Sequence, residues 1–315
     1  MPYRRGMPLV VLGSANLDHV HRVSRIPAPG ETVLALEYRT FPGGKGLNQA
    51  VAAARTAPGT VFVTSLGNDA AGDELAAVLD EEPLELHARR GERRTGTAQI
   101  TVDASGENAI VVDSGANADL TGLSTPEAAL VEGATVLLLQ LEIPLATVVE
   151  AARTARAAGT TAVLNAAPIG PLPGELLAAL DLLVVNEHEA RELGAERGIT
   201  ANDDTALAVA LTALVPVVVV TLGGDGAVVA VRGRTPLRAP AFRVQAVDTT
   251  GAGDTFCGAL AARLASTAHD LDDPEALLSA VSWASAAAAI SVTRHGAAVS
   301  APTAQETEAF LAEHA

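Results

Sequence analysis

The amino-acid sequence predicts an α/β fold with a mainly parallel central sheet that helices cover on both faces. Apolar runs rich in leucine or β-branched residues are typical of buried strands, and they occur at Leu9–Leu12, Val61–Ser65, Val136–Leu141, Thr161–Leu164, Leu182–Val185 and Val217–Leu222. Alanine-rich segments are typical of helices, and they occur at Asn48–Arg55, Asp73–Leu79, Leu145–Ala158, Glu187–Leu193, Ala206–Leu214, Thr255–Ala265 and Pro274–Val292. Because strands that alternate with helices form βαβ units, the sheet is expected to be mainly parallel.

Two segments interrupt this order, because polar and apolar residues alternate in residues 16–40 and 97–112. Alternation with a period of two is typical of half-exposed antiparallel strands. The two segments are therefore expected to form a small antiparallel sheet that lies as a lid over one end of the main sheet. This assigns residues 1–15, 41–95 and 114–315 to the α/β domain, and residues 16–40 and 96–113 to the lid.

The composition argues against several classes of protein. No uninterrupted apolar stretch reaches the ~18 residues that span a bilayer, and the run Leu9–Leu12 is too short for a signal peptide. One cysteine among 315 residues excludes an internal disulfide and is typical of a reducing compartment. A formal net charge of −16 argues against nucleic acid and anionic membranes as partners. A soluble, cytoplasmic protein is therefore expected.

The only lysine of the chain is Lys45, which lies in the glycine-rich segment Gly43-Gly44-Lys45-Gly46, although the sequence holds 21 lysines and arginines together. A compact ammonium group differs physically from a planar guanidinium, and flanking glycines indicate a loop that approaches a ligand. The alternative is that a single lysine falls here by chance. The pattern favours a ligand-binding role.

The segment Val247–Leu260 carries the strongest chemical signal. Gly251, Ala252 and Gly253 lead into an apolar helix, so their backbone N–H groups are expected to form an anion site. Asp254 would lie beside that site, where it could take a proton from a hydroxyl group while the N–H groups hold a phosphoryl group. The alternative is an ordinary N-cap aspartate, which leaves the two glycines and Asp248 without explanation.

The segments Phe41–Asn48 and Val247–Leu260, taken together, resemble motifs of the ribokinase-like (PfkB-type) carbohydrate kinases. The resemblance covers nearly the whole chain, including Val11–His19, Gly30–Val33, Phe242–Thr249 and Ala288–Gly296. It implies a three-layer αβα sandwich with a β lid, and phosphorylation of the primary hydroxyl of a pentose, first of all D-ribose, by ATP with Mg²⁺. It also implies a homodimer in which two lids pack together.

The resemblance implies a sugar site made of Asn16, Asp18, Gly44, Lys45, Gly46, Asn48, Glu142 and Asp254. The residues themselves agree with this role. A carboxylate such as Asp18 can accept hydrogen bonds from both hydroxyls of a diol, and Glu142 follows a predicted strand, where α/β sheets bind ligands. Asp18 taken alone is equally consistent with a solvated turn.

The resemblance places ATP at Asn186, Thr221, Gly223, Gly224, Gly226, Gly253 and Ser285, with Glu189 holding Mg²⁺ through water. Each pattern has a structural alternative. Asn186 and Glu189 have the spacing of a helix capping box, and Thr221–Gly226 could be a simple hairpin turn. Ser285 occupies a position where the family often has histidine, which weakens its assignment. The chain has no Walker A motif.

The family also uses a monovalent cation, usually K⁺, beside the anion site. The resemblance places it at Asp248, Thr250, Ser291, Arg294, Gly296 and Ser300, mostly through backbone carbonyls. Backbone ligands tolerate changes of side chain, so the identities of these residues neither support nor oppose the site.

Several alternatives stay open at this stage. The acceptor could be 2-deoxyribose, fructose or a nucleoside, or the chain could be a non-catalytic sugar-binding regulator, which would be expected to lack the base or the glycines. Cys257 is expected to be packed and inert. The arginines between Arg89 and Arg94 are expected to lie in a solvated loop.

Overall fold

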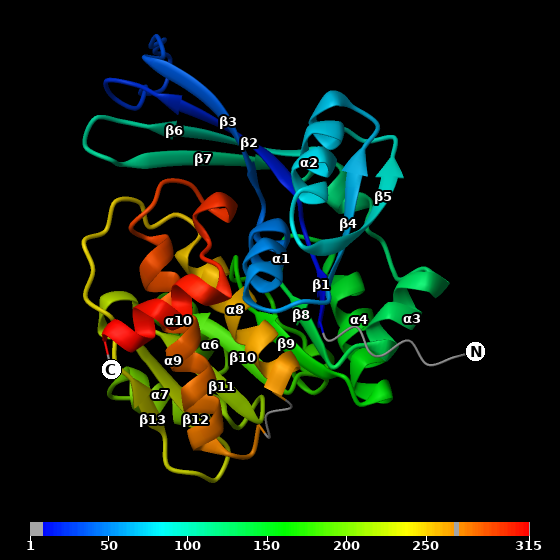
Figure 1. Cartoon of the computed structure of the whole chain (residues 1–315), viewed down its shortest axis with the longest axis vertical. Coiled ribbons are helices and arrows are strands. Elements are labelled where there is room, and N and C mark those ends of the chain that lie inside the picture. Colours follow the sequence, from blue (N-terminus) through cyan, green and yellow to red (C-terminus); the bar gives the residue numbers. More distant parts are fainter. Residues whose placement is uncertain (1–8, 268–270, 315) are drawn as a thin grey trace.

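The computed structural model describes residues 9–267 and 271–314, which form an α/β sandwich with a second, smaller sheet at one end (Figure 1). The main sheet has nine strands in the order β13-β12-β11-β10-β9-β8-β1-β4-β5. Their bounds are β1 Leu9–Leu12, β4 Thr60–Gly67, β5 Leu84–Gly91, β8 Val136–Leu139, β9 Thr161–Asn165, β10 Leu182–Asn186, β11 Val217–Thr221, β12 Ala227–Val231 and β13 Leu237–Ala239. All pairs from β5 to β11 are parallel, and β12 and β13 add an antiparallel edge. The predicted α/β class is confirmed.

The continuous apolar runs reflect burial on both faces of this sheet. In β1, Leu9 and Val11 belong to one apolar core, whereas Val10 and Leu12 belong to another on the opposite face. The first core is covered by α1 Lys45–Thr56, α2 Ala70–Asp80, α8 Ala252–Thr267 and α9 Pro274–Ser291. The second is covered by α3 Thr125–Gly133, α4 Leu145–Ala158, α5 Gly174–Leu177, α6 Glu187–Glu196 and α7 Asp204–Leu211. The arrangement is a three-layer αβα sandwich. The helix α10 Ala304–Glu313 follows near the C-terminus, and the short 3₁₀ turns are Gly115–Asp119, Gly223–Asp225 and Ala298–Ser300.

The smaller sheet has four strands in the order β3-β2-β6-β7, with bounds β2 Asn16–Arg22, β3 Glu37–Gly43, β6 Gly96–Val102 and β7 Asn108–Asp113. The pairs β2–β3 and β6–β7 are antiparallel, as predicted, but the central pair β2–β6 is parallel. The predicted lid sheet is therefore present and mostly antiparallel, with one parallel pair at its centre. β2 follows β1 and β6 follows β5, and because β1 and β5 run in the same direction, both lid strands leave the main sheet with the same orientation.

The helices α1 and α8 lie side by side and make an extensive contact (Figure 1). Gly258 of α8 faces α1, and a Cβ atom at this position would lie 2.3 Å from the carbonyl oxygen of Gln49. Only glycine therefore permits this approach. It brings the first turn of α1 next to the first turn of α8.

The strand β5 was not predicted, and it contains two of the four arginines that were expected in a solvated loop, whereas Arg93 and Arg94 follow it in an exposed loop, as expected. Arg89 and Arg90 belong to β5. The guanidinium of Arg89 donates to Glu127 of α3, with 2.7 Å between Nε and Oε1. Arg90 donates to the carbonyl oxygen of Gly67 at 2.8 Å and forms an ion pair with Asp73. These arginines join an edge strand to its neighbours. Among the described helices, none is long and apolar enough to cross a membrane.

Candidate active site

The candidate site lies at the carboxyl ends of the parallel strands, under the lid. Ser14, Glu142, Asn165, Asn186 and Thr221 follow or end β1, β8, β9, β10 and β11 respectively. The first turns of α1 and α8 lie against the same edge, because Lys45 and Asp254 line one cavity. This is where open α/β sheets bind ligands.

The first turn of α8 supplies unpaired amides. Its turn requires glycine at position 251, where φ is +74° and a Cβ atom would lie 2.8 Å from the backbone of Ala297. Thr255 donates to the carbonyl oxygen of Gly251 at 2.8 Å, so the amides of Gly253 and Asp254 lie in the turn whose N–H groups have no intrahelical partner. Space in front of Gly253 is open, since a Cβ atom there would meet nothing within 4 Å. A cavity of 150 Å³ is lined by Gly251, Ala252, Gly253 and Asp254 from this turn.

Asp254 is buried, and each of its carboxylate oxygens accepts one hydrogen bond from α1. Asn48 Nδ2 lies 3.0 Å from Oδ2, and Gln49 Nε2 lies 2.9 Å from Oδ1. The nearby negative charge of Asp254 raises the pKa of Lys45, against the opposing effect of burial, and Glu142 and Glu189 add to the rise. Lys45 is therefore a permanently charged ammonium group facing the carboxylate.

Glu142 is held by the loop after β1 and by α1. Its Oε2 accepts from Ser14 Oγ at 2.6 Å and from the amide of Lys45 at 2.9 Å. Gly46 is required here, because a Cβ atom at this position would lie 2.5 Å from the backbone of Ser14. The structure thus brings Glu142, Lys45 and Gly46 together.

Asn16 and Asp18 enter the site from the first lid strand. The amide of Asn117 donates to Asn16 Oδ1 at 2.7 Å, and both residues line a cavity of 430 Å³ with Glu142. Asp18 Oδ1 is buried and accepts no hydrogen bond from the described residues. Burial, and then the charges of Glu142 and Asp254, raise the pKa of Asp18 to about 7. An orphaned carboxylate oxygen of this kind has the chemistry to accept a ligand hydroxyl.

Glycines on the neighbouring strand make room for Asp18. A Cβ atom at Gly43 would lie 2.1 Å from Asp18 Oδ2. Gly44 has a φ of +87°, and a Cβ atom there would lie 2.9 Å from the amide of Asn16. The pair Gly43-Gly44 therefore allows α1 to begin directly against the lid strand.

Asn186 and Glu189 form the capping box that their spacing indicated, with two hydrogen bonds of 2.8 Å. They also line the 150 Å³ cavity in front of α8, together with Thr221. Burial raises the pKa of Glu189, against the hydrogen bond from Asn186. Mg²⁺ is usually held by one or two carboxylates plus substrate phosphates, so the carboxylate of Glu189, which shares this cavity with that of Asp254, fits an ion that arrives with a nucleotide. No cluster of three or more acidic, histidine or cysteine ligands occurs within residues 9–267 and 271–314.

The remaining residues that were assigned to ATP, Gly223, Gly224, Gly226 and Ser285, line neither of the two site cavities. Gly223 and Gly224 form a 3₁₀ turn between β11 and β12, which pair as the expected hairpin. Gly226 has a φ of +89°, and a Cβ atom there would lie 2.0 Å from Ala239 O, so this glycine is required by the fold. Ser285 lies on α9.

The segments that were assigned to a monovalent cation lie next to each other beside α8. Asp248 accepts from the amides of Thr250 at 2.9 Å and Gly296 at 3.0 Å. Although burial acts in the opposite direction, these hydrogen bonds lower the pKa of Asp248. Ser291 and Ser300 are buried, and both hydroxyls donate to local carbonyl oxygens, whereas the side chain of Arg294 points to Glu306. Any role for Arg294 would therefore involve its backbone.

The sequence analysis missed five polar residues of the site. Four of them are fully or nearly fully buried: Ser14, Gln49, Asn117 and Gln140. The fifth, Asn165, accepts from Gln49 Nε2 at 3.0 Å. Ser14, Gln140 and Asn165 stand at or just after the end of an apolar strand, where a buried polar side chain needs a partner, whereas Gln49 and Asn117 carry no such signal.

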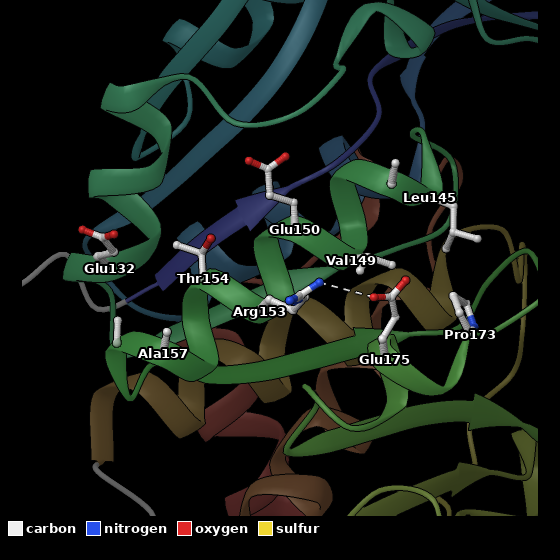
Figure 2. A pocket seen from close by; sticks show the side chains of 11 residues that line it. Glu132, Leu145, Val149, Glu150, Arg153, Thr154, Ala157, Pro173 and Glu175 are labelled. Carbon is white, nitrogen blue, oxygen red and sulfur yellow. Dashed lines mark hydrogen bonds and ion pairs between the residues drawn. The ribbon is translucent and has the colours of Figure 1, made fainter.

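A further cavity has a volume of 1010 Å³ and lies on the outer face of α4 (Figure 2). It is lined by Glu132, Glu150, Arg153, Thr154 and Glu175, among others, and Arg153 forms an ion pair with Glu175 at 3.3 Å. None of the residues assigned above lines it. The groove is thus separate from the candidate site.

The chain is similar to proteins of one known family over nearly its whole length. A family model described as "pfkB family carbohydrate kinase" matches residues 8–304. The chain is 39% identical to ribokinase of Haemophilus influenzae, over 98% of this chain and 99% of that protein. It resembles the crystal structure of Thermotoga maritima ribokinase, with a TM-score of 0.88, 38% identity and coverage of 96% and 99%. It also resembles Arabidopsis thaliana ribokinase complexed with ribose and ATP, with a TM-score of 0.85, 32% identity and coverage of 96% and 98%. The chain therefore belongs to the PfkB family of carbohydrate kinases.

Proposed function

We propose that this carbohydrate kinase transfers the γ-phosphoryl group of ATP to the 5-hydroxyl group of D-ribose. The observation that carries the proposal is the position of Asp254. The carboxylate of Asp254 accepts a hydrogen bond from Asn48, a predicted sugar ligand. Asp254 also lies in the first turn of α8, whose amides line the 150 Å³ cavity proposed to hold the ATP phosphates. Asp18 lies close enough to Glu142 and Asp254 to interact with their charges, and Lys45 interacts with the same two carboxylates. The relatives named above, which are described as ribokinases, support ribose as the acceptor.

In the proposed mechanism, Asp18, Asn16 and Glu142 hold the sugar hydroxyls by hydrogen bonds. Asp254 takes the proton of the 5-hydroxyl group while the oxygen of that hydroxyl attacks the γ-phosphorus in line, and ADP leaves. The amides of Gly253 and Asp254 and the ammonium of Lys45 stabilise the charge on the transferring phosphoryl oxygens.

Mg²⁺, held by Glu189 through water, would neutralise charge on the ATP phosphates. The loops around Asp248 would hold K⁺ beside the anion site, using Thr250, Ser291, Arg294, Gly296 and Ser300. Asn186, Thr221, Gly223, Gly224, Gly226 and Ser285 would surround the nucleotide.

The acceptor is tested by measuring ADP release with ribose, 2-deoxyribose, fructose and adenosine, each with and without K⁺. Ribose is expected to give the highest kcat/KM, and 2-deoxyribose a value lower by about 10-fold or more, because one hydrogen bond to a charged group contributes about 1.5–3 kcal/mol. Omission of K⁺ is expected to lower the rate with ribose. A preference for adenosine or fructose would contradict the proposed substrate. Absence of any sugar-dependent ADP release would instead favour a non-catalytic, sugar-binding regulator.

We further propose that the protein forms a homodimer through its lid. The lid exposes large apolar side chains on β7 and around β3: Leu34, Leu36, Tyr38, Ile110, Val111 and Val112. Leu36 and Val111 are 74% and 71% exposed, and large apolar side chains exposed on one small sheet are a candidate interaction surface.

A mass of two chains is expected for the wild type in solution, measured by light scattering. Val111→Glu is expected to give monomers, because it would bury an unpaired charge. Val209→Glu is a matched control, since Val209 is an exposed valine on α7 outside the lid. A monomeric wild type, or a dimeric Val111→Glu variant, would exclude a lid interface.

A further inference from the structure

Behind the candidate site lies a chain of buried amide side chains that the proposed mechanism does not use. Gln140 donates from Nε2 to Gln49 Oε1 at 2.7 Å. Gln49 Nε2 donates in turn to Asn165 Oδ1 at 3.0 Å and to Asp254 Oδ1 at 2.9 Å. Gln49 and Gln140 are fully buried, so neither is positioned to contact a substrate.

The bonds fix which way the Gln49 amide points. Both of its N–H groups are used, one by Asn165 and one by Asp254, and its oxygen is used by Gln140. Reversal of the amide would place the Gln49 oxygen against a carboxylate and an N–H group against another N–H group. Because unsatisfied buried polar groups are costly, the observed orientation is strongly favoured.

Asn48 and Gln49 act on different oxygens of the same carboxylate. Asn48, a predicted sugar ligand, donates a hydrogen bond to Oδ2 of Asp254, and the fully buried Gln49 donates one to Oδ1. Two donors on two oxygens fix the plane of a carboxylate as well as its position. The approach of α1 to α8 at Gly258 makes both contacts possible.

We infer that Gln49 is a positioning residue for the carboxylate of Asp254, and that Gln140 sets the direction of the Gln49 amide. The inference rests on the proposed function, since it assumes that Asp254 is the base. Gln49 aims the carboxylate at the acceptor hydroxyl, and Gln140 acts through Gln49 without touching Asp254.

Other charged and titratable groups also interact with Asp254, and they are unchanged by substitutions at Gln49. Lys45 of α1 and Asp18 of β2 are two of them. Glu189 of α6 and Cys257 of α8 are the others for which such an interaction is resolved. A new pH dependence in a Gln49 variant is therefore attributable to the introduced group.

The test compares Gln49→Glu, Gln49→Met and Gln140→Glu with the wild type, by kcat and KM between pH 6 and 9 with ribose and ATP. In Gln49→Glu, two carboxylates share one proton, and only a protonated Glu at position 49 can donate to Asp254. We expect kcat to be about 100-fold lower at pH 8 and to decline as pH rises, whereas wild-type kcat does not decline in this range. Values of KM are expected to stay within about threefold, because neither side chain contacts substrate.

The other two variants distinguish the loss of the hydrogen bond that orients Asp254 from the addition of a charge beside it. Gln49→Met removes the donor without adding a titratable group, so kcat falls and its pH dependence stays that of the wild type. Gln140→Glu leaves Asp254 and Gln49 intact but places an acceptor against the Gln49 oxygen. The ionised form disfavours the observed direction of the amide, whereas the protonated form can still donate to it. We therefore expect kcat to fall toward the Gln49→Met value as pH rises, and a kcat equal to the wild type at pH 9 would exclude a role for Gln140.

Thr64→Val is the matched control, because Thr64 is a fully buried residue of β4 whose hydroxyl has no hydrogen-bond partner among the described residues. Its kcat is expected to equal that of the wild type, and thermal denaturation shows that each variant is folded. An active wild type together with unchanged kcat in Gln49→Glu or Gln49→Met would overturn the inference alone. A wild type without sugar-dependent turnover would overturn the proposed function and the inference together.

Discussion

Replacement of Asp254 with asparagine is expected to lower kcat by about 10²–10⁴-fold, the usual contribution of a positioned base. The amide that replaces the carboxylate has similar shape but cannot take the proton of the acceptor hydroxyl. It also offers only one acceptor oxygen to the two donors, Asn48 and Gln49, that face it. Affinities for sugar and ATP are expected to change only a few-fold, because the cavities keep their other lining residues.

The measurement combines turnover with direct binding of sugar and of ATP to the Asp254→Asn variant. Asp73→Asn is a suitable control, since Asp73 also lies in the first turn of a helix, α2, but its side chain is 77% exposed. That control is expected to show normal turnover. Near-normal turnover in Asp254→Asn would show that another group accepts the proton.

Replacement of Asp18 with asparagine is expected to weaken sugar binding by about 100-fold and to stabilise the sugar-free protein at pH 8. Both effects have one cause. Asp18 is held beside Glu142 and Asp254 with one oxygen unpaired, which makes its ionised form costly in the absence of sugar. Asparagine keeps the shape, removes the charge and loses the charge-assisted hydrogen bonds to the sugar hydroxyls.

The sign of the pH effect follows from the raised pKa of Asp18, about 7 compared with an ordinary value of 3.8. Between these two values the folded protein holds the proton more tightly than the unfolded chain does, so the free energy of unfolding falls as pH rises. The decrease in the free energy of unfolding is complete above pH 7. It amounts to at most about 4 kcal/mol, because each unit of difference in pKa corresponds to about 1.4 kcal/mol. Asp18→Asn removes this loss.

Thermal unfolding of both proteins without sugar, at pH 4 and pH 8, tests the stability effect. The variant is expected to unfold at a higher temperature at pH 8 and at nearly the same temperature at pH 4. Binding of ribose by the wild type is expected to tighten as pH rises through 7, because ionised Asp18 accepts hydroxyl hydrogens, and this dependence should vanish in the variant. Equal stabilities at both pH values would contradict a strained, ionised Asp18.

Much of the main sheet could be predicted, because strands buried on both faces read as continuous apolar runs. All six predicted strands are present, from β1 to β11. Edge strands carry weaker signals. β5 pairs with only one neighbour and includes Glu85, Arg89 and Arg90, so its composition resembles that of a loop. The parallel pairing of β2 with β6 could not be predicted, since side chains alternate with the same period in parallel and antiparallel strands.

Among the predicted site residues, Lys45 and Asp254 were singled out by neighbouring glycines, whereas Asp18 and Glu142 rested mainly on the family resemblance. The structure brings all four to one edge of the sheet. The residues that orient them were missed for a physical reason. Gln49 follows the motif Phe41–Asn48 but lies in an alanine-rich helix, and Gln140 lies next to an apolar strand, so the sequence does not show which groups these side chains contact. Their partners become apparent only when α1 and α8 are packed together.

The contact between α1 and α8 also has a consequence for synthesis of the chain. Asn48 and Gln49 precede Asp254 by 206 and 205 residues, so at bacterial and eukaryotic translation rates of ~5–20 residues per second they wait roughly 10–40 s for their acceptor. During this time the apolar residues of α1 that pack in the same core as α8, such as Leu47 and Ala50, have no cover from that helix. The nascent protein therefore exposes the apolar face of α1 until α8 is made, and its candidate catalytic centre is completed only when about the last fifth of the chain has been synthesised.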